Sequence, residues 1–190
     1  MKTALVLASN SPRRRQLLQE AGLTFTIRPS TIEEHMDQKL PPSKVVTDLA
    51  AQKAESVPKN DEEVVLGADT IVTVDGKILG KPSNEEEAFK TLRFLSGRTH
   101  EVFTGVALVK GKETSTFYSR TEVTFYELTD EEITRYIGTG EPMDKAGSYG
   151  IQGKGALFVK EISGDYYAVV GLPLSKTMRE LKKLGVSLPQ

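Results

Sequence analysis

Strand-like and helix-like segments alternate along this 190-residue chain, and the alternation restricts its fold more than any other feature. Ala4–Ala8 is a short continuous apolar run, and Val64–Val74 is apolar except for one aspartate and two threonines. Such runs are typical of strands that are buried on both faces. The alternation predicts a mixed α/β fold. Because no stretch has the composition of a flexible linker, we expect a single domain over residues 1–190.

Capping residues indicate where several helices begin. Ser11 followed by Pro12 predicts a helix start, and Gly22 predicts the end of that helix. Two further pairs, Ser83 with Glu86 and Thr129 with Glu132, have the spacing of a capping box. Helices are also expected at 44–57 and 174–184. Two long strands are expected at 100–109 and 113–128 and shorter ones at 23–28, 77–79, 156–162 and 166–170, with a hairpin turn at Asp75-Gly76.

Composition excludes several classes of protein. The 25 Lys and Arg nearly balance the 26 Asp and Glu, so a broadly basic surface for nucleic acid is not expected. Without cysteine there is no disulfide framework, thiolate nucleophile or cysteine-ligated zinc. The two histidines are too few for a three-histidine site. The apolar runs are too short for a secretory signal or a membrane span, so we expect a cytoplasmic protein without a membrane partner.

The segment Ser9-Asn10-Ser11-Pro12-Arg13-Arg14-Arg15 lies between an expected strand and the start of an expected helix. Hydroxyl groups, backbone N–H groups and the positive end of a helix dipole favour an anion there. Three arginines in a first helical turn oppose that dipole, and a phosphate chain would explain them, because guanidinium groups bind phosphate oxygens bidentately. The alternative is a capped helix with a solvated basic face.

Asp69 is the most informative single residue. A carboxylate inside an apolar strand costs several kcal/mol unless it is paired, hydrogen-bonded or bound to a metal. Such an acid can activate water, and the alternative is a structural carboxylate that closes a turn before Thr70. Lys53 falls in the middle of the apolar arc of helix 44–57, so its cation either extends to the edge of the core or projects into a cleft.

Other candidates carry weaker signals. Lys81 follows the predicted hairpin, and Glu34 beside His35 is either a metal ligand or solvated charge. The glycine-rich stretch 144–155 fails the pattern of a P-loop, although the amide of Gln152 suits the edge of a nucleotide base. His100 is expected to be a structural strand residue.

Five motifs taken together resemble the Maf family, and the resemblance covers essentially the whole chain. They are Leu7-Ala8-Ser9-Asn10-Ser11-Pro12-Arg13-Arg14, Gly67-Ala68-Asp69-Thr70-Ile71-Val72, Gly80-Lys81-Pro82, Asp144-Lys145-Ala146-Gly147 and Gly171-Leu172-Pro173. The resemblance implies a cytosolic nucleoside triphosphate pyrophosphatase that forms a homodimer. It also implies a fold like that of inosine triphosphate pyrophosphatases, with an elongated, twisted mixed β-sheet flanked by helices and two lobes around a central cleft.

Within that family, Arg13, Thr70 and Gln152 resemble the pyrimidine-type subgroup, which hydrolyses dTTP, UTP and some modified pyrimidine nucleotides. The reaction cleaves the α–β phosphoanhydride to give a monophosphate and pyrophosphate, with a link to cell-division arrest. The alternatives are a 7-methyl-GTP or purine-type pyrophosphatase and a non-catalytic, nucleotide-binding regulator of septum formation.

The resemblance also assigns roles to individual residues. Asp69 and Glu34 would bind a divalent cation, Mg²⁺ or Mn²⁺ or else Co²⁺, and whether Asp69 is a metal ligand or a general base stays open. The catalytic set it implies is Asp69, Lys81, Lys53 and Glu34, and the substrate-binding set is Ser9, Ser11, Arg13, Arg14, Thr70 and Gln152.

Overall fold

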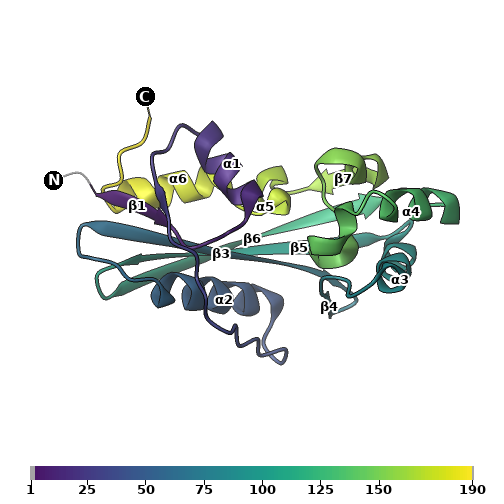
Figure 1. Cartoon of the computed structure of the whole chain (residues 1–190), viewed down its shortest axis with the longest axis horizontal. Helices are drawn as coiled ribbons and strands as arrows, with labels where there is room; N and C mark the ends of the chain where they lie inside the picture. Colours follow the sequence, from purple (N-terminus) through teal and green to yellow (C-terminus); the bar gives the residue numbers. More distant parts are fainter. Residues whose placement is uncertain (1–2, 190) are drawn as a thin grey trace. The chain divides into compact units, whose positions relative to one another are not determined.

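The computed structural model describes residues 3–189 and has the mixed α/β fold expected from the sequence (Figure 1). Within these residues, seven strands form one sheet in the order β2-β1-β3-β5-β6-β7, and β4 pairs with β3. The strand β1 pairs in parallel with β2 and β3, whereas β3–β4 and β6–β7 are antiparallel, so the sheet is mixed. The strands are β1 (Ala4–Leu7), β2 (Thr26–Ile27), β3 (Glu63–Val74), β4 (Lys77–Leu79), β5 (Thr99–Lys110), β6 (Glu113–Phe125) and β7 (Val159–Ser163).

Six α-helices and three 3₁₀-helices lie in the described residues. The α-helices are α1 (Pro12–Glu20), α2 (Pro42–Ser56), α3 (Glu85–Leu95), α4 (Asp130–Ile137), α5 (Tyr166–Val170) and α6 (Leu174–Lys183). The 3₁₀-helices are η1 (Glu141–Asp144), η2 (Ala146–Ser148) and η3 (Gly153–Phe158). None of the helices in residues 3–189 combines the length and the apolar character that a membrane span requires.

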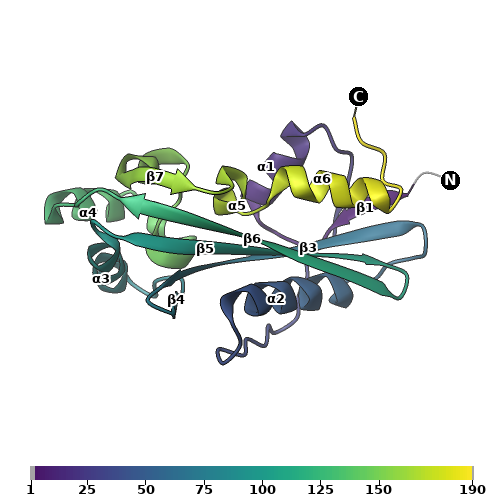
Figure 2. The same cartoon turned by 180° about the vertical axis from the view of Figure 1, so that it is seen from behind.

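The chain divides into two compact units that interleave along the sequence. The first comprises the described parts of Met1–Asp69 and Gly171–Gln190 together with Thr104–Ser119, and the second comprises Thr70–Phe103 and Arg120–Val170. In the first unit, α2 covers one face of the strands, and α1 and α6 lie on the other face (Figures 1 and 2). The candidate site residues are divided between the two units.

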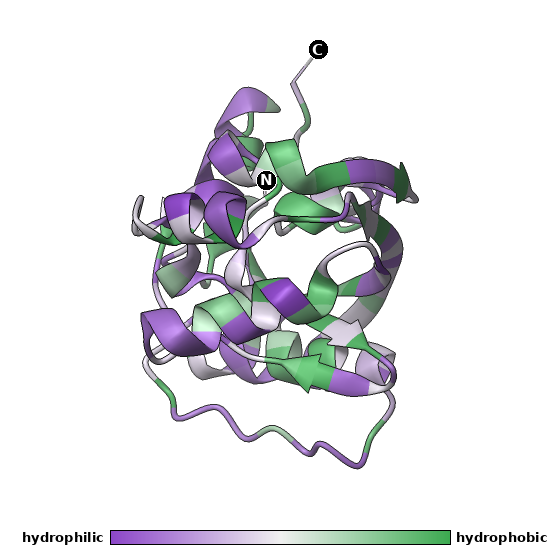
Figure 3. Cartoon of the chain, turned by 90° about the vertical axis from the view of Figure 1, so that its right-hand side faces the viewer, coloured by the Kyte–Doolittle hydropathy of each residue, from purple (hydrophilic) through white to green (hydrophobic). Residues whose placement is uncertain are grey.

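Helices of the second unit combine a polar face with a buried one. In α4, Ile133, Tyr136 and Ile137 are buried, and the first turn carries three acidic residues. Hydrophilic and hydrophobic bands alternate along the helices in Figure 3, as expected of helices that pack one face into a core. The capping box predicted at Thr129 and Glu132 is confirmed.

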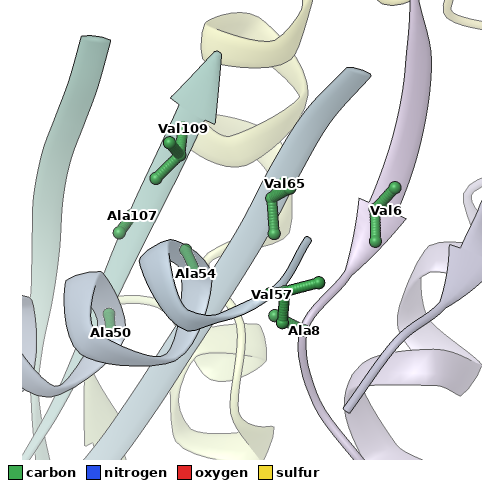
Figure 4. Packing of buried hydrophobic residues seen from close by; sticks show 8 residues of the cluster. All are labelled: Val6, Ala8, Ala50, Ala54, Val57, Val65, Ala107 and Val109. Atoms are coloured by element: carbon green, nitrogen blue, oxygen red, sulfur yellow. The ribbon is translucent and has the colours of Figure 1, made fainter. Parts of the chain in front are cut away.

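The core of the first unit lies between α2 and the sheet. Ala50 and Ala54 of α2 pack against side chains from three strands in one continuous cluster (Figure 4). Its other members, none more than 3% exposed, are Val6, Ala8, Val57, Val65, Ala107 and Val109. The alanines of α2 are small, which lets the helix backbone lie close to the strands.

The local signals at two turns are confirmed. Ser11 caps α1, since its side chain accepts a hydrogen bond from the Arg14 N–H, and Pro12 is the first helical residue. The Asp75-Gly76 turn joins β3 to β4, and both residues adopt a positive φ, +49° and +74°. This is the geometry of the tight hairpin turn that an Asp-Gly pair predicts.

Several local predictions differ from the structure, and one of them is the strand expected at 156–162, whose first three residues belong to the 3₁₀-helix η3. Residues 166–170 form the helix α5 and not a strand, because Asp165 Oδ1 accepts hydrogen bonds from the backbone N–H groups of Tyr167 and Ala168 and starts a helix there. The cap of α3 is Asn84, one residue after Ser83, because the Asn84 side chain accepts the Glu87 N–H at 2.9 Å. The strand expected at 23–28 is reduced to the two residues of β2.

Candidate active site

Lys53 lies between two carboxylates of the first unit. Its Nζ donates a hydrogen bond to Asp69 Oδ1 at 2.5 Å and lies 3.2 Å from Glu34 Oε2. The side chains of Lys53 and Asp69 are each 14% exposed, and that of Glu34 is 43% exposed. The ammonium group of Lys53, which lies in the apolar arc of α2, therefore contacts two carboxylates. The structure thus brings together three of the four residues expected to be catalytic.

Two glycines explain why α2 approaches the sheet closely enough for this contact. A Cβ atom at Gly67 of β3 would lie 2.3 Å from the Ala50 carbonyl oxygen, and one at Gly105 of β5 would lie 2.3 Å from that of Val46. Neither position can hold a side chain without displacing the helix. Because side chains alternate along a strand, Asp69 points to the same face as Gly67, toward α2.

The sequence interpretation missed this function of Gly67 and Gly105. A glycine within an otherwise apolar strand signals the close approach of another backbone, so the signal was present. The partner of that approach is α2, which can be identified only once the strands and the helix are placed in space.

The start of α1 forms a second polar group in the same unit. Ser9 Oγ accepts hydrogen bonds from the Ser11 N–H at 3.1 Å and from Arg14 Nη1 at 3.4 Å. Arg14 Nε donates to the carbonyl oxygen of Gly171 at 2.8 Å, so the Gly171-Leu172-Pro173 motif supports this arginine. Ser9, Ser11 and Arg14 are thus brought together, as expected of an anion site at a helix start.

Arg14 connects the two polar groups electrostatically. Only 9% of it is exposed, and this burial lowers the pKa of its guanidinium, while the carboxylates of Asp69 and Glu34 act in the opposite direction. Arg13 lies near enough to lower the same pKa by charge repulsion. Three cations, Arg13, Arg14 and Lys53, therefore accompany two carboxylates, an arrangement that favours a polyanion.

The remaining predicted site residues belong to the second unit. Thr70 directly follows Asp69 in β3 and is half-buried, and Lys81 is exposed. Gln152 is half-buried and precedes η3. Their cooperation with the residues around Asp69 stays a prediction.

Two motifs of the second unit are joined by their backbones. The Gly147 N–H donates to the Gly80 carbonyl oxygen at 3.1 Å, which links the Asp144–Gly147 motif to the Gly80-Lys81-Pro82 motif. Gly147 has φ +71°, and a Cβ there would lie 3.0 Å from both methyl carbons of Val72. The glycine-rich stretch thus forms short 3₁₀ turns that support the segment carrying Lys81.

The two carboxylates of the first unit fit a divalent cation, to which a substrate would add further ligands. Across residues 3–189, no three His, Cys, Asp or Glu side chains are grouped so that they could hold a metal ion. Glu34 and Asp69 nevertheless share one ammonium group, so their oxygens converge on one cationic position. In proteins, Mg²⁺ is usually bound by one or two carboxylates together with substrate phosphates and water.

Comparison with known proteins gives consistent matches. The family model described as "Maf-like protein" matches residues 4–184, which include all five motifs. Relatives named "dTTP/UTP pyrophosphatase" from Bacillus cereus (strain ZK / E33L) and Bacillus anthracis are 57% and 56% identical over 185 residues, covering 97% of this chain and 97% of each relative. A solved HAM1 protein from Coxiella burnetii shares the fold, with 16% identity and a TM-score of 0.52 over 96% of this chain and 100% of that one.

Proposed function

The chain belongs to the Maf family, and from this premise we propose that it hydrolyses the α–β phosphoanhydride of dTTP and UTP to the monophosphate and pyrophosphate. Relatives 57% identical over nearly the whole chain carry the name of that activity. The observation that carries the proposal is the contact of Lys53 with Asp69 and Glu34, in the electrostatic neighbourhood of Arg14. This group combines the acid that hydrolysis needs with the cations that a triphosphate needs.

Each residue of this group has a distinct part in the proposed reaction. Arg13, Arg14 and Lys53 neutralise the phosphate oxygens as charge develops on the leaving pyrophosphate. Ser9 and Ser11 orient a phosphate at the start of α1. The proposed reaction needs no covalent intermediate. Much of the rate enhancement would therefore come from holding the reactants in place.

Asp69 is the acid that acts on water in this proposal, and Glu34 assists it. Asp69 either accepts the proton of the attacking water as a general base or would hold the cation that makes this water more acidic. Mg²⁺, Mn²⁺ or Co²⁺ held by Glu34 and Asp69 would supply further neutralisation of the triphosphate and make water more acidic. Lys81 of the second unit is proposed as an additional catalytic cation.

Thr70 and Gln152 are proposed to select the pyrimidine base. The side-chain amide of Gln152 offers a hydrogen-bond donor and an acceptor to the edge of a base. A mismatched base would leave these polar groups unpaired. We further propose that the chain acts as one domain within a cytoplasmic homodimer, without nucleic acid or membrane as a partner, and that its activity is linked to cell-division arrest. These points rest on the family resemblance and on the balanced charge of the chain.

The proposal is tested by measuring pyrophosphate release from UTP, dTTP, ATP, GTP and 7-methyl-GTP in the presence of Mg²⁺ or Mn²⁺. We expect kcat/KM for UTP and dTTP to exceed that for the purine nucleotides by about 100-fold or more. Equal cleavage of GTP or 7-methyl-GTP would contradict the pyrimidine assignment. Tight binding of UTP without release of pyrophosphate would instead favour a non-catalytic regulator.

A further inference from the structure

Gln52 of α2 holds the backbone of His35 with both ends of its side-chain amide. Gln52 Nε2 donates to the His35 carbonyl oxygen at 2.9 Å, and the His35 N–H donates to Gln52 Oε1 at 2.9 Å. A carboxamide offers a donor and an acceptor side by side, so it can pair with one residue's backbone much as a neighbouring strand would. This pair of hydrogen bonds fixes His35 against the helix.

The residues next to this pair belong to the candidate active site. Gln52 precedes Lys53 in α2, and Glu34 precedes His35 in the segment between β2 and α2. Consecutive residues of the helix therefore hold consecutive residues of the segment, Gln52 through the His35 backbone and Lys53 through the Glu34 carboxylate. Because the Glu34 side chain is 43% exposed, packing alone does little to locate it.

The contact between Lys53 and Glu34 is the weaker of the two restraints. Lys53 Nζ is 3.2 Å from Glu34 but 2.5 Å from Asp69, so the ammonium group is held chiefly by Asp69. A cation that binds both carboxylates competes with that ammonium group for the same oxygens. The two hydrogen bonds of Gln52 go to the backbone of His35, so they do not take part in this competition.

We propose that Gln52 is a positioning residue that keeps Glu34 within reach of Asp69 when a divalent cation binds. The inference rests on the proposed function for the role of Glu34 as a metal ligand. It adds a residue that touches neither substrate nor metal and acts through the backbone of the neighbouring residue. Loss of a residue that orients a metal ligand in this way commonly weakens metal affinity by about 10- to 100-fold.

The test compares Gln52→Met with the wild-type protein. Methionine keeps a similar length and fills similar space, but it removes both hydrogen bonds to His35. We expect the dissociation constant for Mn²⁺, measured from the free-ion signal in electron paramagnetic resonance, to rise about 10-fold. We also expect hydrogen exchange at the His35 amide, followed by NMR, to become faster, because that amide loses its acceptor.

Ser56→Ala is the matched control. The hydroxyl groups of Ser56 and Ser30 are hydrogen-bonded at 2.9 Å, so Ser56 joins the same helix to the same segment, four residues before Glu34. We expect this variant to bind Mn²⁺ like the wild-type protein and to leave exchange at the His35 amide unchanged.

Three outcomes would overturn the inference: unchanged Mn²⁺ affinity in Gln52→Met, unchanged exchange at His35, or an equal loss of affinity in Ser56→Ala. The absence of Mn²⁺ binding by the wild-type protein would overturn it as well, since Glu34 would then have no metal to bind. Neither readout depends on catalysis. Suppose that the wild-type protein binds Mn²⁺ but cleaves no nucleotide, and that Gln52→Met binds Mn²⁺ more weakly. This result would refute the proposed function and leave the positioning role of Gln52 intact.

Discussion

Two clusters of ionisable side chains, one in each unit, differ in the partners that their buried groups have. Around Asp69 the carboxylates lie against the ammonium group of Lys53 and near the guanidinium of Arg14. Around His100, which is 1% exposed, the partner is the neutral hydroxyl of Tyr149 at 2.6 Å. Burial lowers the pKa of His100 to about 4 and raises the pKa of Tyr149. Burial without an opposite charge thus favours the neutral forms of His100 and Tyr149. The carboxylates of the Asp69 group instead lie in contact with a cation.

The second cluster is also packed as a structural core. The His100 and Phe125 rings meet edge to face with centroids 4.9 Å apart, and Phe125 meets Tyr149 in the same way at 4.7 Å. Such aromatic pairs contribute to stability beyond the area they bury. We therefore expect the Asp69 group to carry out the proposed chemistry and the His100 cluster to contribute to stability.

Asp69→Asn has the largest expected effect. The amide can neither accept a proton from water nor bind a cation as a carboxylate does, so kcat for UTP should fall at least about 100-fold in steady-state assays. Asp75→Asn is the matched control, because Asp75 is exposed, pairs with Arg98 and lies in a turn whose positive φ asparagine tolerates. Near-normal turnover by folded Asp69→Asn protein would remove this acid from the reaction.

Gly67→Ala should affect both stability and activity. Its Cβ would lie 2.3 Å from the Ala50 carbonyl oxygen, so α2 must move, and Lys53 with it. We expect kcat/KM to fall roughly 10- to 100-fold, since a displacement of about 1 Å can cost that much. Overpacking should also lower the free energy of unfolding by about 1–3 kcal/mol.

The variant Gly105→Ala separates the effect of Gly67→Ala on stability from its effect on activity. It introduces an equally close contact with Val46 of the same helix, two turns before Lys53. Urea unfolding should show a similar loss of stability, while kcat/KM should change much less. Equal losses of activity in both variants would show that Gly67 acts on the whole helix and not on the contact with Asp69.

His100 should make the stability of the protein depend on pH. Burial lowers its pKa in the folded state below the unfolded value of 6.5, so the unfolded chain takes up the proton first. The stabilising effect is complete above pH 6.5 and is lost as the pH falls toward 4. Lowering the pH from 7.5 to 5 should therefore lower the free energy of unfolding by about 2 kcal/mol through His100.

Urea unfolding at both pH values measures this effect. His100→Gln should be less stable at pH 7.5 but should lack this part of the pH dependence. His35→Gln, which removes the other histidine, should retain it, because His35 is exposed. An unchanged pH dependence in His100→Gln would contradict the account of the second cluster.

Arg14→Lys has the smallest expected effect. Lysine cannot reproduce the guanidinium fork that bonds to the Gly171 carbonyl oxygen and can bind phosphate oxygens bidentately. The KM for UTP should rise about 10-fold, the equivalent of one strong hydrogen bond. Arg15→Lys, at an exposed neighbouring position, should leave the KM unchanged, and equal effects would show that only net charge at this helix start matters.

Much of the fold follows from local signals in the sequence. Ser11-Pro12, Asp75-Gly76 and the pair Thr129 and Glu132 each act within a few residues, and the structure confirms all three. The strand predicted at 166–170 is wrong, because a short apolar run suits a buried helical turn as well as a strand. The hydrogen bonds of Asp165 decide for the helix.

The candidate site was predictable only in part. Asp69 stands out in the sequence because a carboxylate in an apolar strand needs a partner. The identity of that partner depends on how close α2 lies to the sheet, which Gly67 determines through a contact with Ala50. Gln52 gave no signal, because a glutamine on a helix surface looks solvated until the His35 backbone is placed against it.

The central claim is that the Asp69 group hydrolyses the α–β phosphoanhydride of a pyrimidine nucleotide. The most direct measurement is the separation and quantification of the products formed from UTP by the wild-type protein with Mg²⁺. The account predicts UMP and pyrophosphate in equal amounts. UDP with inorganic phosphate, or unchanged UTP, would contradict it.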